Sequence, residues 1–401
     1  RECGLTWQNN LKRVACSAID QRVSSLRQLS EAIWANPELN YEEHKAHSLL
    51  TSFLKREDFD VDEKYTLDTA FRARAGGDSG INVAFICEYD ALPDIGHACG
   101  HNLIAEAGCA AGIGLKAALE ATESASGRVT IMGTPAEEGG YGKIRMIENG
   151  CFKDVDITMM VHPYLLNVVD GVFIARDSMV ITYTGKASHA AAFPWEGINA
   201  LDAAVSAYNG ISMLRQQMKP TWRAHGIISN GGAKPNIIPE KSELQYYLRA
   251  PTNAELDVLK AKVEHILQSA ADTTGCQVEV KSTGRYSNLI SNSRLEKLYV
   301  YNAQTLGVEF DPKGKTTAGS TDMGDVSYII PTIHPMYSIG TTAYNHTREF
   351  TKAANSDFGH QQTLTVAKAM AMTAIDILTN PELLKDTREA FQNELETARH
   401  P

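Results

Sequence analysis

A cysteine and a histidine that could bind a metal ion stand two positions apart in the segment GHACGHN, residues 96–102. Cys99 and His101 point to the same side of an extended or turning chain, and thiolate and imidazole are common ligands of zinc. A structural zinc finger needs four ligands in two close pairs, and the sequence has no second pair of this kind. A nucleophilic Cys99 beside a histidine is a second interpretation, although it gives no task to the acidic residues nearby.

Carboxylates and further histidines follow several segments that have the pattern of buried strands. They are Glu88 and Asp90 after INVAFIC, Glu137 and Glu138 after RVTIMGTPA, His162 after DITMMV, and His346 after PMYSIGTTAYN. In an open α/β sheet the ligand site lies beyond the carboxyl ends of the strands, so these side chains are expected to converge with the Cys/His pair. Each alone is weak, because a Glu-Glu turn is more often solvated and a lone histidine more often structural.

Adjacent carboxylates beside a cation could divide the work of hydrolysis. One of Glu137 and Glu138 could bind the metal while the other takes a proton from an attacking water. Such a site also needs a donor for the developing oxyanion and a cation for a substrate carboxylate. His189, Asn236 and Arg249, in the middle of the chain, have side chains of these types.

Alternating strand and helix patterns indicate the elements that position these residues. The alternation over residues 81–163 is typical of a mainly parallel α/β sheet. From about residue 172 the order becomes β-α-β-β-α-β, the ferredoxin-like unit, and the α/β pattern then resumes. The sequence predicts an α/β catalytic domain in two parts, residues 1–176 and 291–401, interrupted by an inserted α+β lid or dimerisation domain over residues 177–290.

Three local expectations concern the site directly. Asn102 is expected to cap the helix over residues 102–121. The segments 156–163 and 331–340 are each expected to form a single strand.

Composition excludes several classes of protein. The 401 residues are 43% hydrophobic and 21% charged, as in a soluble globular protein. A net charge of −10 without a cluster of Lys and Arg argues against nucleic-acid binding. The sequence has no apolar run of nearly 18 residues, so we expect no membrane-spanning segment. Seven scattered cysteines and a start without the apolar core of a signal peptide favour reduced thiols and a cytoplasmic location.

Six motifs together resemble the aminoacylase/carboxypeptidase-G family of metal-dependent amidohydrolases and exopeptidases. They are HACGHN, GTPAEE, MVHP, GKASHAAAFPWEGINAL, GGAKPNIIPEKSELQYYLR and GSTDMGDVS, in this order. They are most similar to the branch with a cysteine in the metal motif, which includes auxin-conjugate, hippurate and aminobenzoyl-glutamate hydrolases, and within it to the β-alanyl-lysine dipeptidases. The resemblance implies a zinc-exopeptidase-like α/β domain with a mostly parallel sheet and a ferredoxin-like lid that often forms dimers.

The resemblance also implies a role for each candidate residue. The ligands of two divalent ions, zinc or manganese, would be Cys99, His101, Glu138, His162 and His346. Glu137 would be the general base. His189 and Asn236 would meet the substrate's carbonyl and carboxylate, from the same chain or across a dimer, and Arg249 would hold the terminal carboxylate. Asn102 departs from the pattern, because many members of the branch have Asp there.

The implied reaction is metal-dependent hydrolysis of the amide bond of small dipeptides with a C-terminal, basic amino acid, such as β-alanyl-lysine. An N-acyl-amino-acid amidohydrolase of the aminoacylase, hippurate or aminobenzoyl-glutamate type is the alternative, because only the acyl pocket would differ. A catalytically inactive binding or dimerisation relative is an alternative of another class, although every ligand position is filled. The expected partners are the small substrate and a second copy through the lid, with no nucleic acid and no membrane.

Overall fold

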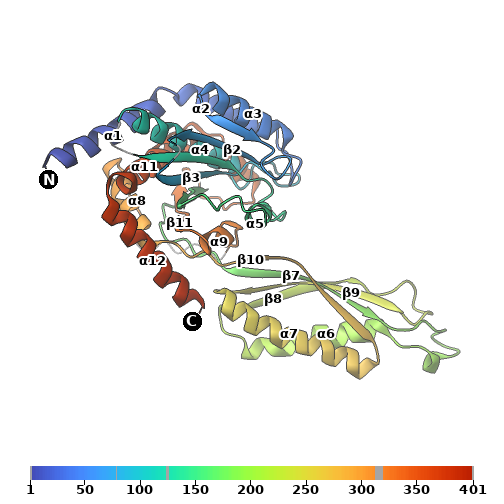
Figure 1. Ribbon diagram of the computed structural model, residues 1–401. Helices are drawn as coiled ribbons and strands as arrows, with labels where there is room; N and C mark the ends of the chain where they lie inside the picture. Colours follow the sequence, from blue (N-terminus) through green and yellow to red (C-terminus); the bar gives the residue numbers. More distant parts are fainter. Residues whose placement is uncertain (1, 78, 123–125, 312–318, 400–401) are drawn as a thin grey trace. The chain divides into compact units, whose positions relative to one another are not determined.

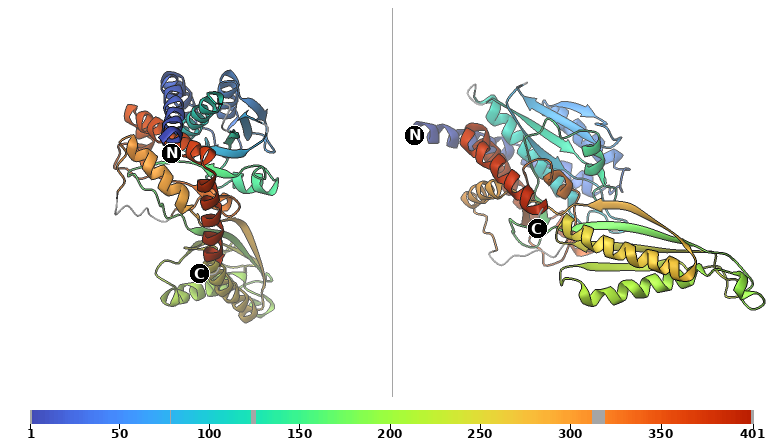
Figure 2. Two further views of the ribbon diagram at one scale, coloured as in Figure 1. Left: turned by 60° about the vertical axis from the view of Figure 1, so that its left-hand side comes forward. Right: turned by 60° about the horizontal axis from the view of Figure 1, so that its bottom comes forward.

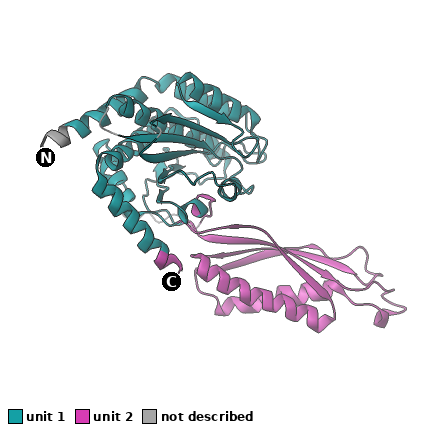
Figure 3. Cartoon of the chain, in the orientation of Figure 1, with its two compact units in different colours: residues 1–172, 290–317, 325–395 teal, residues 173–289, 318–324, 396–401 magenta. Residues whose placement is uncertain are grey.

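The computed structural model describes residues 2–77, 79–122, 126–311 and 319–399. They form two compact units, shown in different colours in Figure 3. Unit 1 comprises residues 1–172, 290–317 and 325–395, and unit 2 comprises residues 173–289, 318–324 and 396–401. Each unit has its own hydrophobic core.

Unit 1 is built of helices packed around a sheet (Figure 1). Outside residues 173–289 the helices are α1 (Glu2–Asp20), α2 (Val23–Trp34), α3 (His44–Arg56), α4 (His101–Glu120), α5 (Gly142–Glu148), α8 (Ser293–Thr305), α9 (Met323–Ser327), α10 (Arg348–Ala353), α11 (Asp357–Thr379) and α12 (Pro381–Arg399). The strands are β1 (Asp60–Glu63), β2 (Phe71–Gly76), β3 (Ile81–Cys87), β4 (Gly127–Gly133), β5 (Ile157–Met159), β6 (His162–Tyr164), β11 (Thr332–Ile333) and β12 (Met336–Ser338).

The main sheet of unit 1 has the strand order β1-β2-β4-β3-β5-β11. The strands β4, β3, β5 and β11 run parallel, and β2 pairs with β4 in the antiparallel direction. Cys87, the last residue of β3, lies opposite Gly133, the last residue of β4. The segments that follow these two strands therefore leave the sheet at the same edge. The mainly parallel α/β class predicted from the sequence is confirmed.

Helix α4 packs against β3 and β4 of the sheet and against the helices α1, α2 and α11. A Cβ atom on Gly112 would lie 2.3 Å from Cδ1 of Ile131 on β4, so a larger residue there would force the Ile131 side chain to move. Among the described residues α4 is also the helix long and apolar enough to cross a membrane, contrary to the expectation of no such segment. Because 83% of its most apolar stretch is buried inside the unit, α4 has the burial of a core helix.

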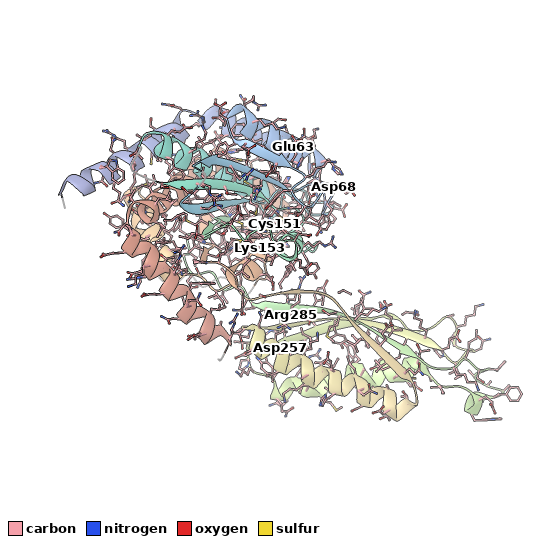
Figure 4. All side chains as sticks on the ribbon, viewed as in Figure 1. Glu63, Asp68, Cys151, Lys153, Asp257 and Arg285 are labelled. Atoms are coloured by element: carbon pink, nitrogen blue, oxygen red, sulfur yellow. The ribbon has the colours of Figure 1, made fainter. Side chains whose placement is uncertain are left out.

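Unit 2 contains the β-α-β-β-α-β order predicted for the insert. Its elements are β7 (Ala175–Thr184), α6 (Ala200–Leu214), β8 (Arg223–Asn230), β9 (Lys241–Ala250), α7 (Asn253–Thr274) and β10 (Gln277–Tyr286), with short 3-10 turns at Pro194–Glu196 and Arg215–Gln217. The strands form an antiparallel sheet in the order β10-β7-β9-β8. Helices α6 and α7 lie side by side on one face of this sheet (Figure 2), and Arg285 of β10 reaches Asp257 of α7 at 2.6 Å (Figure 4).

Three local expectations were wrong. Gly100, not Asn102, caps α4, because a left-handed residue (φ 77°) is needed where Pro163 leaves no room for a Cβ atom. Asn102 is buried instead, and its amide donates hydrogen bonds to Ser30 Oγ and Ala354 O at 3.0 and 2.9 Å. The segments 156–163 and 331–340 each form two short strands: β5 and β11 pair in the main sheet, while β6 and β12 pair in a separate sheet.

Candidate metal centre

The loop between β3 and α4 brings Cys99 and His101 to the carboxyl edge of the main sheet. His101 is the first residue of α4, and the left-handed Gly100 turns the chain between the two side chains. A Cβ atom on Gly100 would lie 2.5 Å from Cγ of Pro163, so the loop packs directly against the segment that carries His162. As a result, Cys99 Sγ lies 3.4 Å from His162 Nε2.

The turn after β4 carries the two adjacent carboxylates. Ala136, the residue before Glu137, has a positive φ of 58°, which is uncommon for a residue with a Cβ atom. Glu138 donates its backbone N–H to Asp90 Oδ2 at 2.9 Å, and its Oε1 lies 3.1 Å from His346 Nε2. His346 is held there because its backbone N–H donates to Ala98 O at 2.8 Å.

All six side chains of unit 1 that were predicted to serve the site lie in one cluster. Three overlapping groups have ligand atoms within 4.8 Å of one another: Cys99 with His101 and His162, Cys99 with Glu138 and His346, and His101 with Glu137 and Glu138. Residues from position 99 to position 346 in the chain therefore meet at one edge of the sheet, as the strand-end argument predicts.

Hydrogen bonds outside the cluster orient the imidazoles within it. His101 Nδ1 lies 3.0 Å from Asp90 Oδ1, so its Nε2 faces the cluster. His162 Nδ1 donates to the carbonyl oxygen of Pro163 at 2.9 Å, which likewise leaves Nε2 as a lone-pair donor toward Cys99. This use of one ring nitrogen to orient the other is typical of metal-bound histidine.

Burial and neighbouring charges set the protonation of these groups. Burial tends to lower the pKa of His101, but the Asp90 carboxylate outweighs it and holds the pKa of this imidazole above its ordinary value. Burial lowers the pKa of His162 to about 4, so this imidazole is neutral near pH 7. Burial, reinforced by the Glu138 carboxylate, raises the pKa of the Cys99 thiol. A cation among these groups would favour the thiolate and stabilise Glu138.

The cluster fits a divalent metal ion. His101 Nε2 is buried and, among the described residues, has no hydrogen-bond partner, and Glu138 Oε1 is also buried, with the ring nitrogen of His346 3.1 Å away. A buried polar atom in this state is costly unless another group satisfies it. Thiolate, imidazole and carboxylate together are donors that suit zinc and, for the harder ligands, manganese.

Sequence reasoning missed two neighbours of the cluster, His334 and Lys143, whereas Glu88 was expected to lie there. His334 is buried between β11 and β12, with its ring centroid 5.5 Å from that of His162, and burial holds the pKa of His334 well below its ordinary value. Lys143 and Glu88 form a fully buried ion pair, and the second oxygen of Glu88 lies 3.5 Å from His101 Nε2. His334 stands inside the segment 331–340, which was interpreted as one continuous strand. A histidine in the middle of such a segment is the sequence signal that could have drawn attention to it.

In unit 2, the loops of His189 and Asn236 lie next to each other. Ala190 donates its backbone N–H to the carbonyl oxygen of Asn236 at 3.1 Å. His189 is exposed, and its Nδ1 accepts from the backbone N–H groups of Ala191 and Ala192 at 3.3 and 3.1 Å. Because Nδ1 accepts, the proton of the neutral ring is on Nε2, which is therefore available as a donor.

Arg249 lies at the opposite end of the same sheet. It is opposite Arg176 in the β7/β9 register, whereas the pairing ends at Thr184 and Lys241, five residues before His189 and five residues after Asn236. Eight residue steps along β9 span about 26 Å. Arg249 donates to Ser320 Oγ at 3.1 Å, with Nε 3.4 Å from His225 Nε2. One chain therefore does not bring all three lid residues together, because a dipeptide is much shorter than this separation.

An α/β unit with a buried cluster of thiol, imidazole and carboxylate groups at its strand ends, interrupted by a ferredoxin-like unit, defines the class of two-domain metal-dependent hydrolases. Residues 176–274 match the peptidase dimerisation domain of the M20 family. The chain is 50% identical to the Xaa-Arg dipeptidase of Mus musculus, over 96% of this chain and 93% of that protein.

More distant relatives match over almost the whole chain. The chain is 28% identical to one of the two subunits of the p-aminobenzoyl-glutamate hydrolase of Escherichia coli strain K12, over 94% of this chain and 95% of that protein. A dinuclear metal-binding M20 peptidase from Bacillus subtilis has the same fold, with a TM-score of 0.67 at 21% identity, over 90% of this chain and 99% of that one. The chain belongs to the M20 peptidase family, and the resemblance predicted from its motifs is confirmed.

Cys99→Ala should weaken metal binding without unfolding unit 1. The loss should exceed ~10-fold in apparent affinity, which is the loss that removal of an outer hydrogen-bond partner already causes. Metal content after dialysis against limiting zinc measures it. Cys109→Ala removes another buried thiol, outside the cluster, and should retain wild-type metal content. Equal metal content in the two variants would contradict a ligand role for Cys99.

Proposed function

We propose that this protein is a dipeptidase that uses two divalent ions, zinc or manganese, to hydrolyse the amide bond before a C-terminal basic amino acid. The observation that carries the proposal is the meeting of Cys99, His101, Glu138, His162 and His346 with Glu137 in one cluster of a family member. The choice of substrate is supported by the Xaa-Arg dipeptidase that is 50% identical over almost the whole chain.

The five ligand residues would hold the ions at the carboxyl edge of the main sheet. Divalent ions there lower the pKa of a water molecule and polarise the scissile carbonyl. Asp90 fixes the ring of His101 through Nδ1, and the carbonyl of Pro163 fixes that of His162, so both ligand nitrogens are aimed before any ion binds.

Glu137 would move the proton. Its carboxylate is adjacent to Glu138 in sequence, and one of its oxygens lies within 4.8 Å of ligand atoms of His101 and Glu138. It takes a proton from the attacking water as the C–O bond forms, and it gives that proton to the amide nitrogen as the C–N bond breaks. The products are a carboxylic acid and a free amine, so the proton is accounted for at each step.

His189, Asn236 and Arg249 would act in two groups. The Nε2–H of His189 can donate to the developing oxyanion, and Arg249 can hold the terminal carboxylate. Because the length of β9, about 26 Å from Lys241 to Arg249, lies between these two groups in one chain, we propose that His189 and Asn236 complete the metal site of a second copy. Arg249 of that second copy then serves its own site.

The surface of unit 2 supports such a dimer. Strand β8 is an edge strand, because no other described strand pairs with its outer side, and exposed edges of this kind favour pairing with another chain. It carries Ile227, which is 60% exposed, and helix α6 carries Met213, which is 73% exposed. Apolar side chains of this size on an edge strand and a neighbouring helix are suited to burial against a second copy.

The alternative is an N-acyl-amino-acid amidohydrolase. The 28% identity to a chain of an aminobenzoyl-glutamate hydrolase favours it, since the match covers 94% of this chain and 95% of that protein. Both reactions use the same metal cluster and the same base, so the acyl side of the substrate alone distinguishes them.

Glu137→Gln should abolish most turnover while metal binding persists. The amide keeps the shape of the side chain but cannot take the proton, so kcat should fall by ~10²-fold or more. Hydrolysis of an Xaa-Arg dipeptide and the metal content of the same sample measure it. The matched control is Glu148→Gln on the surface of α5, which should keep wild-type kcat. Near-normal kcat in Glu137→Gln would refute the role of the base.

Mixed dimers test the exchange of lid residues. His189→Ala and Glu137→Gln should each be inactive alone, since one lacks the oxyanion donor and the other the base. When the two variants are co-expressed, activity should recover to about a quarter of wild type, because half of the dimers are mixed and each has one complete site. The measurement is specific activity against the ratio of the two chains.

If His189 serves its own chain, no mixture has a complete site, and activity stays at the level of the single variants. That result would contradict the exchange but would leave the metal cluster and the role of Glu137 untouched.

A further inference from the structure

A short segment before α3 holds the turn that carries Glu137 and Glu138. Asn40 Nδ2 donates to the carbonyl oxygen of Glu138 at 3.2 Å. The hydroxyl of Tyr41 donates to the carbonyl oxygen of Gly140. Glu43 Oε1 accepts from the backbone N–H of Ala136 at 2.9 Å. Residues 40–43 thus contact both ends and the middle of the turn over residues 136–140, nearly 100 positions later in the chain.

Glu43 is the most deeply buried of these three residues. Its side chain is fully buried, and its second oxygen, Oε2, accepts from the hydroxyl of Thr69 at 2.8 Å. Both carboxyl oxygens are therefore occupied by donors within unit 1. This carboxyl group is not among the predicted ligands, and the proposed mechanism gives it no task.

The contact falls where the backbone needs support. Ala136 has a φ of 58°, a conformation that a residue with a Cβ atom adopts only when its surroundings hold it. Ala136 directly precedes Glu137, so its backbone torsions help to set the direction of the Glu137 side chain. A carboxyl oxygen that accepts from the N–H of Ala136 therefore holds a residue on which that direction depends.

We propose that Glu43 is a positioning residue for the general base: its carboxyl oxygen holds the Ala136 peptide in the left-handed conformation that aims Glu137 at the substrate. The inference rests on the proposed function of Glu137. It assigns to Glu43 an effect on the chemical step and none on metal binding, because the hydrogen bonds of its carboxyl group within the described part of the chain go to Ala136 and Thr69 and not to a ligand side chain.

The acceptor atom, and not the negative charge, is the feature that matters. Burial is the main cause that raises the pKa of Glu43 to about 7, and the nearby Asp90 carboxylate adds to it. A neutral form of Glu43 is therefore accessible at ordinary pH. An amide in place of the carboxyl group keeps an oxygen for the N–H of Ala136 and can offer its NH₂ group to the Thr69 oxygen. A side chain of similar size without an oxygen cannot.

Three variants separate these possibilities in the full-length, metal-loaded protein. Glu43→Gln keeps the acceptor and should keep kcat within ~3-fold, whereas Glu43→Met fills the space without an acceptor and should lower kcat by ~10- to 100-fold, as small misplacements of a catalytic group do. KM should change little in both, and both should retain wild-type metal content. Thr69→Val removes the donor to the other carboxyl oxygen and should leave kcat within ~3-fold.

Several results would overturn the inference. Equal kcat in wild type, Glu43→Gln and Glu43→Met would show that Ala136 needs no acceptor. An equal loss of kcat in Glu43→Gln and Glu43→Met would show that the negative charge of Glu43, and not its acceptor oxygen, supports the chemical step. Loss of metal in Glu43→Met would place the effect on the ions. If Glu43→Met does not fold, amide hydrogen exchange in the wild-type protein decides: the Ala136 amide should be protected, and exchange as fast as in an exposed turn would overturn the inference.

The proposed function fails by a different result. Normal turnover in Glu137→Gln would remove the base that Glu43 is said to aim, whatever the Glu43 variants do. Loss of kcat in Glu137→Gln together with normal kcat in Glu43→Met would leave the base in place and reject the positioning role alone.

Discussion

One buried carboxylate, that of Asp90, joins the two halves of the metal centre. Its Oδ1 lies 3.0 Å from His101 Nδ1 at the start of α4, and its Oδ2 accepts the backbone N–H of Glu138 in the turn after β4. Because β3 and β4 are parallel neighbours, Asp90 and Glu138 leave the sheet at the same edge, where this bridge can form. The orientation of His101 and the position of the acidic turn both depend on it.

The sheet explains why the site could be predicted from the sequence to a large extent. Residue types that bind metals follow segments with strand patterns in the sequence. The carboxyl ends of parallel strands lie at the same edge of a sheet, so the residues that follow them come close together. That rule about strand ends, together with the order of the motifs, was enough to predict that His162 and His346 lie near Cys99. Confirmation of the family by a relative with 50% identity over nearly the whole chain shows that the motifs were specific when taken together.

Other features depend on contacts that a single sequence does not display. The cap at Gly100 exists because Pro163, more than sixty positions later, leaves no room for a side chain, whereas the local pattern favoured Asn102. The short strands β5 and β6 enter different sheets, and nothing in DITMMVHP marks the break. The hold of Glu43 on Ala136 joins a loop before α3 to a turn after β4. By contrast, the separation of Asn236 from Arg249 was visible in the sequence, since a single predicted strand lies between them.

The central claim is that metal ions at the edge of this sheet hydrolyse dipeptides that end in a basic residue. The most direct measurement is turnover of a substrate panel by metal-stripped protein that is reloaded stepwise with zinc or manganese, with metal content followed in each sample. The panel sets β-alanyl and γ-aminobutyryl dipeptides of lysine, ornithine and arginine against N-acyl amino acids. We expect no turnover in the stripped protein, full turnover near two ions per chain, and preference for the dipeptides. Turnover that resists a chelator, or a clear preference for the N-acyl amino acids, would contradict the central claim.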